Sequence, residues 1–171
     1  EGDMQANGMK MSAEDIYSVN NSSLKDAIVL FGGGCTGEVI SDQGLLLTNH
    51  HCGRGAIRAR STLENNYLKD GFWANQKADE IANPGLSVTF VIRIEDVTAT
   101  IAKELNENMT PEQRAAKIKE ISAILTKDAT TGTQYEAFVR DFFEGNEFYL
   151  FVKETFKDIR FVGTPPQSAG K

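Results

Sequence analysis

The amino-acid sequence predicts a mainly β fold with appended α-helices, built around antiparallel strands. Three observations support this prediction. A compact apolar run at 26–31 ends at three consecutive glycines, apolar segments at 39–40 and 45–48 flank polar residues, and residues 86–94 alternate between apolar and other side chains. Such alternation and such glycine-bounded runs are typical of strands. With 171 residues, of which 40% are hydrophobic, the chain can bury a real core.

A β-hairpin is predicted directly after the first strand. The apolar residues at 39–40 and 45–48 are joined by residues 41–44, Ser-Asp-Gln-Gly, which favour a turn. Before the first strand, residues 1–25 predict irregular structure with one short helix. A capping box at residues 12–15, Ser-Ala-Glu-Asp, indicates where this helix begins.

Helical segments are predicted over about 111–143. The clearest helix start combines Thr110 as N-cap, Pro111 at the first helical position and Gln113 closing a capping box. A second helix is predicted around 134–143, where aromatic residues recur at helical spacing. We interpret that aromatic stripe as packing rather than as a ligand site.

Several shorter elements complete the prediction. A helix is expected at 55–68 and strands at 148–152 and 159–162, followed by a polar tail that ends at Lys171. The sequence shows no internal repeat and no low-complexity tract.

Charge and hydropathy exclude some classes of protein. The formal net charge is -6, from 18 Lys and Arg against 24 Asp and Glu, which argues against nucleic acid as a partner and is otherwise explained by solubility. No apolar run is long enough to span a membrane, so no transmembrane segment is expected. The polar start at residues 1–3 suggests a chain whose targeting segment has been removed.

The two cysteines, Cys35 and Cys52, lie on either side of the predicted hairpin. A pair is too few for a structural zinc site, which needs four ligands. We favour a disulfide, which would stabilise the fold by about 3 kcal/mol and would imply an oxidising compartment. Two buried free thiols are the alternative.

The segment from Cys35 to Cys52 is the part of the sequence that carries chemistry. It reads as strand, turn, apolar strand and small polar residues, followed by His50, His51 and Cys52. The pattern predicts His51 at the end of a buried strand that is fastened to its neighbour, the rigid placement that a general base needs. Successive strand side chains point in opposite directions, so His50 is expected on the other face and the pair is a poor metal chelate. A satisfied core histidine is the alternative for both.

The segment resembles the histidine region of chymotrypsin-like peptidases, and the whole chain is similar to the S46 dipeptidyl-peptidases. The similarity extends over essentially all 171 residues, through the motifs FGGGCTG at 31–37, TNHHCG at 48–53, DGFWA at 70–74, NPGLSVTF at 83–90 and RIEDV at 93–97.

The resemblance implies the fold and the site. It implies a partial chymotrypsin-like (trypsin-like) antiparallel β-barrel lobe, with residues 1–171 forming the N-terminal part of the peptidase domain. His51 would be the catalytic general base and Cys35 and Cys52 would form the disulfide, with no metal and no cofactor. The Asp and Ser of the triad would lie beyond this chain, so the fragment alone is expected to be inactive.

The resemblance also implies the biological setting. The intact enzyme would release dipeptides from peptides with a free N-terminus, in the periplasm or at the outer membrane of a Gram-negative bacterium. The remainder of the same polypeptide would complete the site, and the intact protein would form a homodimer. No partner of another kind is implied.

Three positions are weighed against the family pattern. Asp96 is separated from His51 by about the interval seen in a chymotrypsin-type triad, but the family places its acid beyond this chain, so we interpret Asp96 as a structural or solvated acid. Arg54 stands where the family usually has an aromatic residue, and Arg58 where a neutral polar residue is common.

Two other functions remain open at this point. The chain could be a stand-alone, non-enzymatic β-rich binding module, or a fragment of a serine endopeptidase with the same base. A reading frame that continues to a glycine-flanked serine would favour an enzyme, and the residues that block the substrate cleft would separate the two peptidases.

Overall fold

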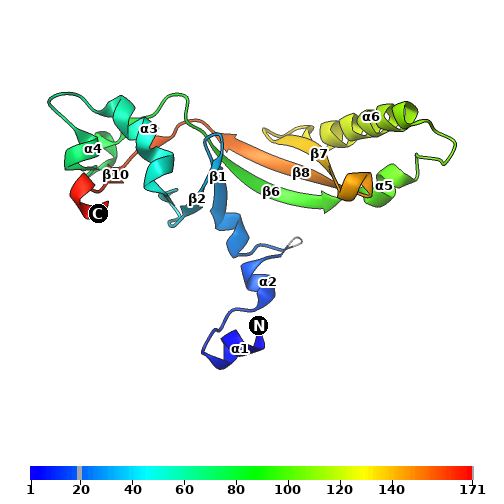
Figure 1. The fold of residues 1–171 in the computed structure, drawn as a ribbon, viewed down its shortest axis with the longest axis horizontal. Helices are drawn as coiled ribbons and strands as arrows, with labels where there is room; N and C mark the ends of the chain where they lie inside the picture. Colours follow the sequence, from blue (N-terminus) through cyan, green and yellow to red (C-terminus); the bar gives the residue numbers. More distant parts are fainter. Residues whose placement is uncertain (19–20, 171) are drawn as a thin grey trace. The chain divides into compact units, whose positions relative to one another are not determined.

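The computed structural model describes residues 1–18 and 21–170. Residues 19–20, within the predicted irregular N-terminal stretch, and Lys171, at the end of the predicted tail, lie outside the described residues. The chain divides into two compact units. Figure 1 shows their helices and strands as a ribbon coloured along the sequence. Unit 1 consists of Glu1–Asp26 and Phe90–Thr155, and unit 2 consists of Ala27–Thr89 and Phe156–Lys171. We describe each unit by itself.

The predicted fold class, mainly β with appended helices, is confirmed. The largest sheet has the hydrogen-bonded strand order β3-β2-β1-β6-β8-β7, with β1 at Ile28–Phe31, β2 at Cys35–Val39, β3 at Leu46–Thr48, β6 at Val88–Asp96, β7 at Glu136–Phe142 and β8 at Glu147–Phe156. Two small sheets pair β4 (Phe72–Trp73) with β10 (Gly163–Thr164) and β5 (Ile81–Ala82) with β9 (Arg160–Phe161).

The predicted hairpin forms in unit 2. Strand β2 pairs antiparallel with β1 on one side and with β3 on the other, and Gly37 lies opposite Thr48. The turn is closed by a hydrogen bond of 2.8 Å from Ile40 N–H to the Leu45 carbonyl, while the Ser41 hydroxyl accepts from Leu45 N–H at 3.0 Å. The turn chemistry of residues 41–44 therefore sets the register that carries the chain from Cys35 to the histidines.

Unit 1 has its own apolar core. Helix α5 (Thr98–Ala102) and helix α6 (Pro111–Thr130) pack against β8, and the core residues are Val97, Ile101, Ile121, Phe148, Leu150 and Val152. The capping box predicted for α6 is present. The Thr110 hydroxyl accepts from Gln113 N–H at 3.3 Å, and the Gln113 side chain accepts from Thr110 N–H at 3.0 Å.

The helix predicted around 134–143, and with it the end of the helical range 111–143, is wrong. Residues Glu136–Phe142 form strand β7, which pairs along its whole length with β8. Its aromatic residues form cross-strand contacts, with Phe138 stacked on Phe151 at 5.2 Å and Phe142 edge-on to Tyr149 at 5.5 Å. These residues satisfy a helical and a strand pattern alike, and pairing with β8 decides between them.

The helix predicted at 55–68 is also divided differently. Helix α3 spans His50–Arg60 and the short helix α4 spans Tyr67–Asp70, so the helix begins directly at the histidine pair. The residues between these helices form hydrogen-bonded turns, with Thr62 N–H donating to the Asn65 carbonyl at 2.9 Å.

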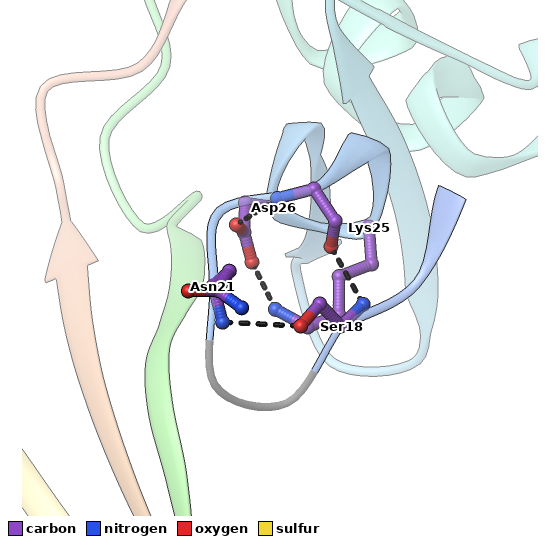
Figure 2. Close-up of polar contacts among 5 residues, drawn as sticks. Ser18, Asn21, Lys25 and Asp26 are labelled. Carbon is purple, nitrogen blue, oxygen red and sulfur yellow. Dashed lines mark hydrogen bonds and ion pairs between the residues drawn. The ribbon is translucent and has the colours of Figure 1, made fainter. Parts of the chain in front are cut away.

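The N-terminal part of unit 1 contains helices α1 (Gly2–Ala6) and α2 (Ala13–Ile16), and the capping box predicted at residues 12–15 is present. A polar network follows (Figure 2): Ser18 N–H donates to the Ser23 hydroxyl at 3.0 Å, and Asn21 N–H donates to the Ser18 hydroxyl at 3.1 Å. Asp26 accepts from Lys25 and from Ser23 N–H. Burial raises the pKa of Asp26, but these two donors outweigh it and hold the pKa below its ordinary value.

In the part of the chain that the structure describes, the remaining elements are four short 3-10 helices: η1 (Leu24–Ala27), η2 (Lys77–Asp79), η3 (Phe143–Gly145) and η4 (Gln167–Gly170). Among the described residues, no helix combines the length and the apolar character needed to cross a membrane.

Gly71 joins α4 to β4 where the chain passes close to the C-terminal segment. Its φ is +77°, and a Cβ at this position would lie 2.8 Å from Pro166 N and 2.9 Å from the Thr164 carbonyl oxygen. Both neighbours are backbone atoms that cannot rotate away, so the close approach requires glycine. Next to it, the rings of Tyr67, Phe72 and Phe161 pack with centroids 5.0–6.1 Å apart.

We expect Gly71→Ala to lower the free energy of unfolding by about 3 kcal/mol, because it combines a left-handed backbone with a backbone clash. Gly85→Ala is the matched control. Gly85 also has a positive φ, +88°, but its Cβ would meet nothing within 4 Å, so the loss there should be about 1 kcal/mol. Urea denaturation of both variants measures the difference, and equal losses would contradict the role of the close approach.

Candidate active site

His51 lies in the first turn of helix α3 and its side chain is exposed. The prediction that His51 lies at the end of a buried strand is wrong. Strand β3 ends at Thr48, and Asn49 is the N-cap of helix α3. His50 and His51 are therefore separated by about 100° around a helix axis rather than placed on opposite faces of a strand. Both side chains are exposed, so the interpretation as satisfied core histidines is wrong.

The sequence contained a weak signal for this helix start. Asn is among the preferred N-cap residues, but the side chain of Asn49 makes no capping hydrogen bond. Gly53 and Gly55 also lower the helical propensity of the segment. The apolar run that ends at Thr48 favoured a longer strand, and only the packing of α3 in unit 2 shows otherwise.

The structure contains the predicted disulfide between Cys35 and Cys52, with the two Cα atoms 6.1 Å apart. Cys35 is the first residue of β2, opposite Phe31 of β1, and Cys52 is in the first turn of α3. The bond therefore fastens the start of the helix to the sheet. The sequence pattern predicted a link between two strands instead. His51 is the residue directly before the fastened cysteine.

The imidazole of His51 lies beside this disulfide. A ring nitrogen of His51 and the sulfur atoms of Cys35 and Cys52 all lie within 4.8 Å of one another. Three such atoms resemble a metal-ligand set, but the sulfurs are bonded to each other and do not provide the thiolates that a metal would bind. The exposed imidazole of His51 therefore lies against a half-buried disulfide.

The other side of α3 holds the helix to unit 2. Ile57 is only 4% exposed and belongs to the buried hydrophobic residues. Arg60, in the last turn, donates from Nε to the side-chain oxygen of the buried Asn83 at 3.3 Å. The helix is thus fastened at its first turn by a covalent bond and farther along by packing and a hydrogen bond. These contacts restrict the position of His51.

Asp96 and two serines, Ser41 and Ser61, have local hydrogen-bond partners. The carboxylate of Asp96, at the end of β6, accepts from Thr98 N–H at 2.9 Å. The hydrogen bonds with the Thr98 side chain and backbone hold the pKa of Asp96 below its ordinary value. The Ser41 hydroxyl closes the hairpin turn, and the Ser61 hydroxyl donates to the Ile57 carbonyl at 3.0 Å. Ser168 lies in η4.

The model of the peptidase S46 family matches residues 1–171. Two curated proteins of Capnocytophaga gingivalis are similar. An Asp/Glu-specific dipeptidyl-peptidase is 54% identical over 171 residues, covering 99% of this chain and 24% of the relative. A dipeptidyl-peptidase 7 is 48% identical over 171 residues, covering 100% of this chain and 24% of the relative. The chain thus spans about a quarter of the length of the curated relatives it matches.

Solved structures give the same result. The crystal structure of Porphyromonas endodontalis DPP11 in complex with the dipeptide Arg-Asp matches with a TM-score of 0.77 and 44% identity. The match covers 99% of this chain and 25% of that one. The same protein in complex with substrate matches with a TM-score of 0.76 and 43% identity, over 98% of this chain and 25% of that one.

Replacing both Cys35 and Cys52 by alanine should lower the free energy of unfolding by about 3 kcal/mol, because the unfolded chain regains the freedom of the closed loop. Denaturation with and without a thiol reductant measures this. The wild type should lose stability in the reductant, whereas the double variant should not respond. Equal responses of the two proteins would contradict a stabilising crosslink.

The carboxyl group of Asp96 should titrate below its ordinary value of 3.8, measured by NMR. Since its pKa is lower in the folded state, its stabilisation is complete above about pH 4 and is lost as the pH falls through the folded pKa. Thr98→Val removes the hydroxyl, which also hydrogen-bonds with the backbone of Phe148, and should raise the pKa of Asp96. Thr98→Ser keeps the hydroxyl and should leave this pKa low. An unchanged pKa in Thr98→Val would contradict the assignment.

Proposed function

The chain belongs to the peptidase S46 family, and from this membership we propose that the whole protein is a serine-type dipeptidyl-peptidase whose general base is His51. The observation that carries the proposal is the placement of this residue. His51 is exposed on the first turn of α3, directly before a cysteine that a disulfide fastens to β2. An accessible imidazole on a rigid support is what general base catalysis requires.

In the proposed mechanism, His51 takes the proton of a serine hydroxyl as that oxygen attacks the scissile carbonyl. It then gives the proton to the amine of the leaving peptide, which departs. The N-terminal dipeptide stays bound to the serine as an acyl group. A water molecule, deprotonated by the same imidazole, completes hydrolysis and restores the serine. The roles of the imidazole need no cofactor.

We propose that the serine and the acid of the triad belong to the part of the protein outside residues 1–171. Within the described residues, Ser41, Ser61 and Asp96 are engaged in local hydrogen bonds that explain their positions. Residues 1–171 on their own would therefore bring a base without its nucleophile and would not hydrolyse peptides. The remainder of the polypeptide is the partner that completes the site.

The substrates of the whole protein would be peptides with a free N-terminus. Relatives named dipeptidyl-peptidases, and a structural neighbour solved with a dipeptide, support this class of substrate. We further propose a location in the periplasm or at the outer membrane of a Gram-negative bacterium, where a disulfide such as Cys35–Cys52 can form. The intact enzyme would act as a homodimer.

Replacing His51 by alanine in the full-length protein should lower kcat/KM for dipeptide release by at least about 10³-fold, because the serine loses its base. His50→Ala is the matched control, since His50 is the neighbouring exposed histidine on the same helix turn. It should retain activity within about threefold.

Release of a chromogenic amine from a dipeptide substrate measures both variants. Undiminished turnover in His51→Ala would refute the assignment, and so would an equal loss in His50→Ala. Residues 1–171 added alone should release no product, and activity in that sample would show that the nucleophile lies within this chain.

A further inference from the structure

The exposed face of α3 is basic. Ile57, Gly53 and Ala56 face inward or are half-buried, whereas the outward side carries His50, His51, Arg54, Gly55, Arg58 and Ala59, all exposed. At 100° per residue, Arg54 and Arg58 lie within about 60° of His51 around the helix axis. The two arginines therefore share the side of the helix that presents the imidazole.

This basic face has no acidic residue close to it in the sequence. Residues 43–63 contain no Asp or Glu, although the whole chain has a net charge of -6. Among the residues that the structure describes, neither Arg54 nor Arg58 forms an ion pair or a side-chain hydrogen bond. Arg60, by contrast, is engaged with Asn83. Gly55 and Ala59 are too small to shield the two guanidinium groups.

The chemistry proposed for His51 indicates which part of a substrate would meet these arginines. The imidazole delivers a proton to the leaving amine, so it must reach the first nitrogen of the leaving peptide. Groups on the same face of α3 can therefore meet the residues that follow this nitrogen. Along the helix axis, Arg54 lies about 4.5 Å and Arg58 about 10.5 Å beyond His51. An extended peptide advances about 3.3 Å per residue, so this span corresponds to the first three residues after the cleaved bond.

We propose that Arg54 and Arg58 bind a carboxylate on the leaving side of the substrate, so that peptides with an acidic group within about three residues after the cleaved bond are preferred. This inference rests on the function proposed above and names a substrate class for the same site. The carboxylate can come from an Asp or Glu side chain or from the free C-terminus of a short peptide. Both sources offer the same group to a guanidinium.

The test uses the full-length protein and peptides that share one N-terminal dipeptide, so that only the leaving part varies. One series carries Asp, Asn or Lys at the second residue after the cleaved bond, with an amidated C-terminus. A second series is neutral and ends in a free carboxylate or an amide at the third residue. Mass spectrometry gives kcat/KM for each peptide.

In the wild type, we expect the Asp peptide to exceed the Asn peptide by about three- to tenfold, and this ratio to shrink at high salt. Arg54→Gln/Arg58→Gln should bring the ratio close to one, whereas Arg54→Lys/Arg58→Lys should keep part of it. Arg140→Gln, which removes an exposed arginine of β7, is the matched control and should leave the ratio unchanged. The second series shows whether a C-terminal carboxylate is selected in the same way.

Two outcomes would overturn the proposal. One is a wild-type ratio near one in both series, and the other is a double variant that loses activity equally on acidic, neutral and basic peptides. Calorimetric binding of the same peptides to His51→Ala measures the preference without turnover. If no peptide is cleaved, the proposed function fails. The ratio of the affinities for the Asp and Asn peptides still decides the role of the two arginines.

Discussion

The disulfide between Cys35 and Cys52 is the constraint on which the rest of the site depends. It joins the first residue of β2, which is a strand of the hairpin, to the first turn of α3, the helix that follows the hairpin. Because His51 is the residue before Cys52, the bond limits where the imidazole can lie. His51 itself is exposed, so this bond restricts a side chain that little other packing holds. Such restricted placement is what the base role that we propose for His51 requires.

Helix α3 combines a buried and an exposed role. Its inward side, with Ile57 buried and Arg60 bonded to Asn83, belongs to the core of unit 2. Its outward side presents the imidazole and two arginines without local acidic partners. One helix of 11 residues thus connects the stability of unit 2 with the chemistry of the site and with the selectivity that we propose.

The two units have separate cores. Unit 1 buries the cluster around Ile101 and Val152, whereas unit 2 depends on Val29, Phe31 and the aromatic contacts of Phe161. Exposed apolar side chains remain on the strands of both units. The chain spans about a quarter of the length of the curated relatives it matches, and the triad that we propose draws on residues outside it.

Local chemistry made much of this protein predictable from its sequence. The turn at 41–44 and the capping box at Thr110 depend on neighbouring residues alone, and the motif around His51 indicated both the family and the candidate base. The tertiary structure decided what nearby residues left open. Residues 134–143 fit a helix or a strand until β8 pairs with them, and the histidines begin a helix because the disulfide and the burial of Ile57 hold α3 against unit 2. Long-range pairing and burial outweigh local propensity at these positions, and a sequence pattern does not contain them.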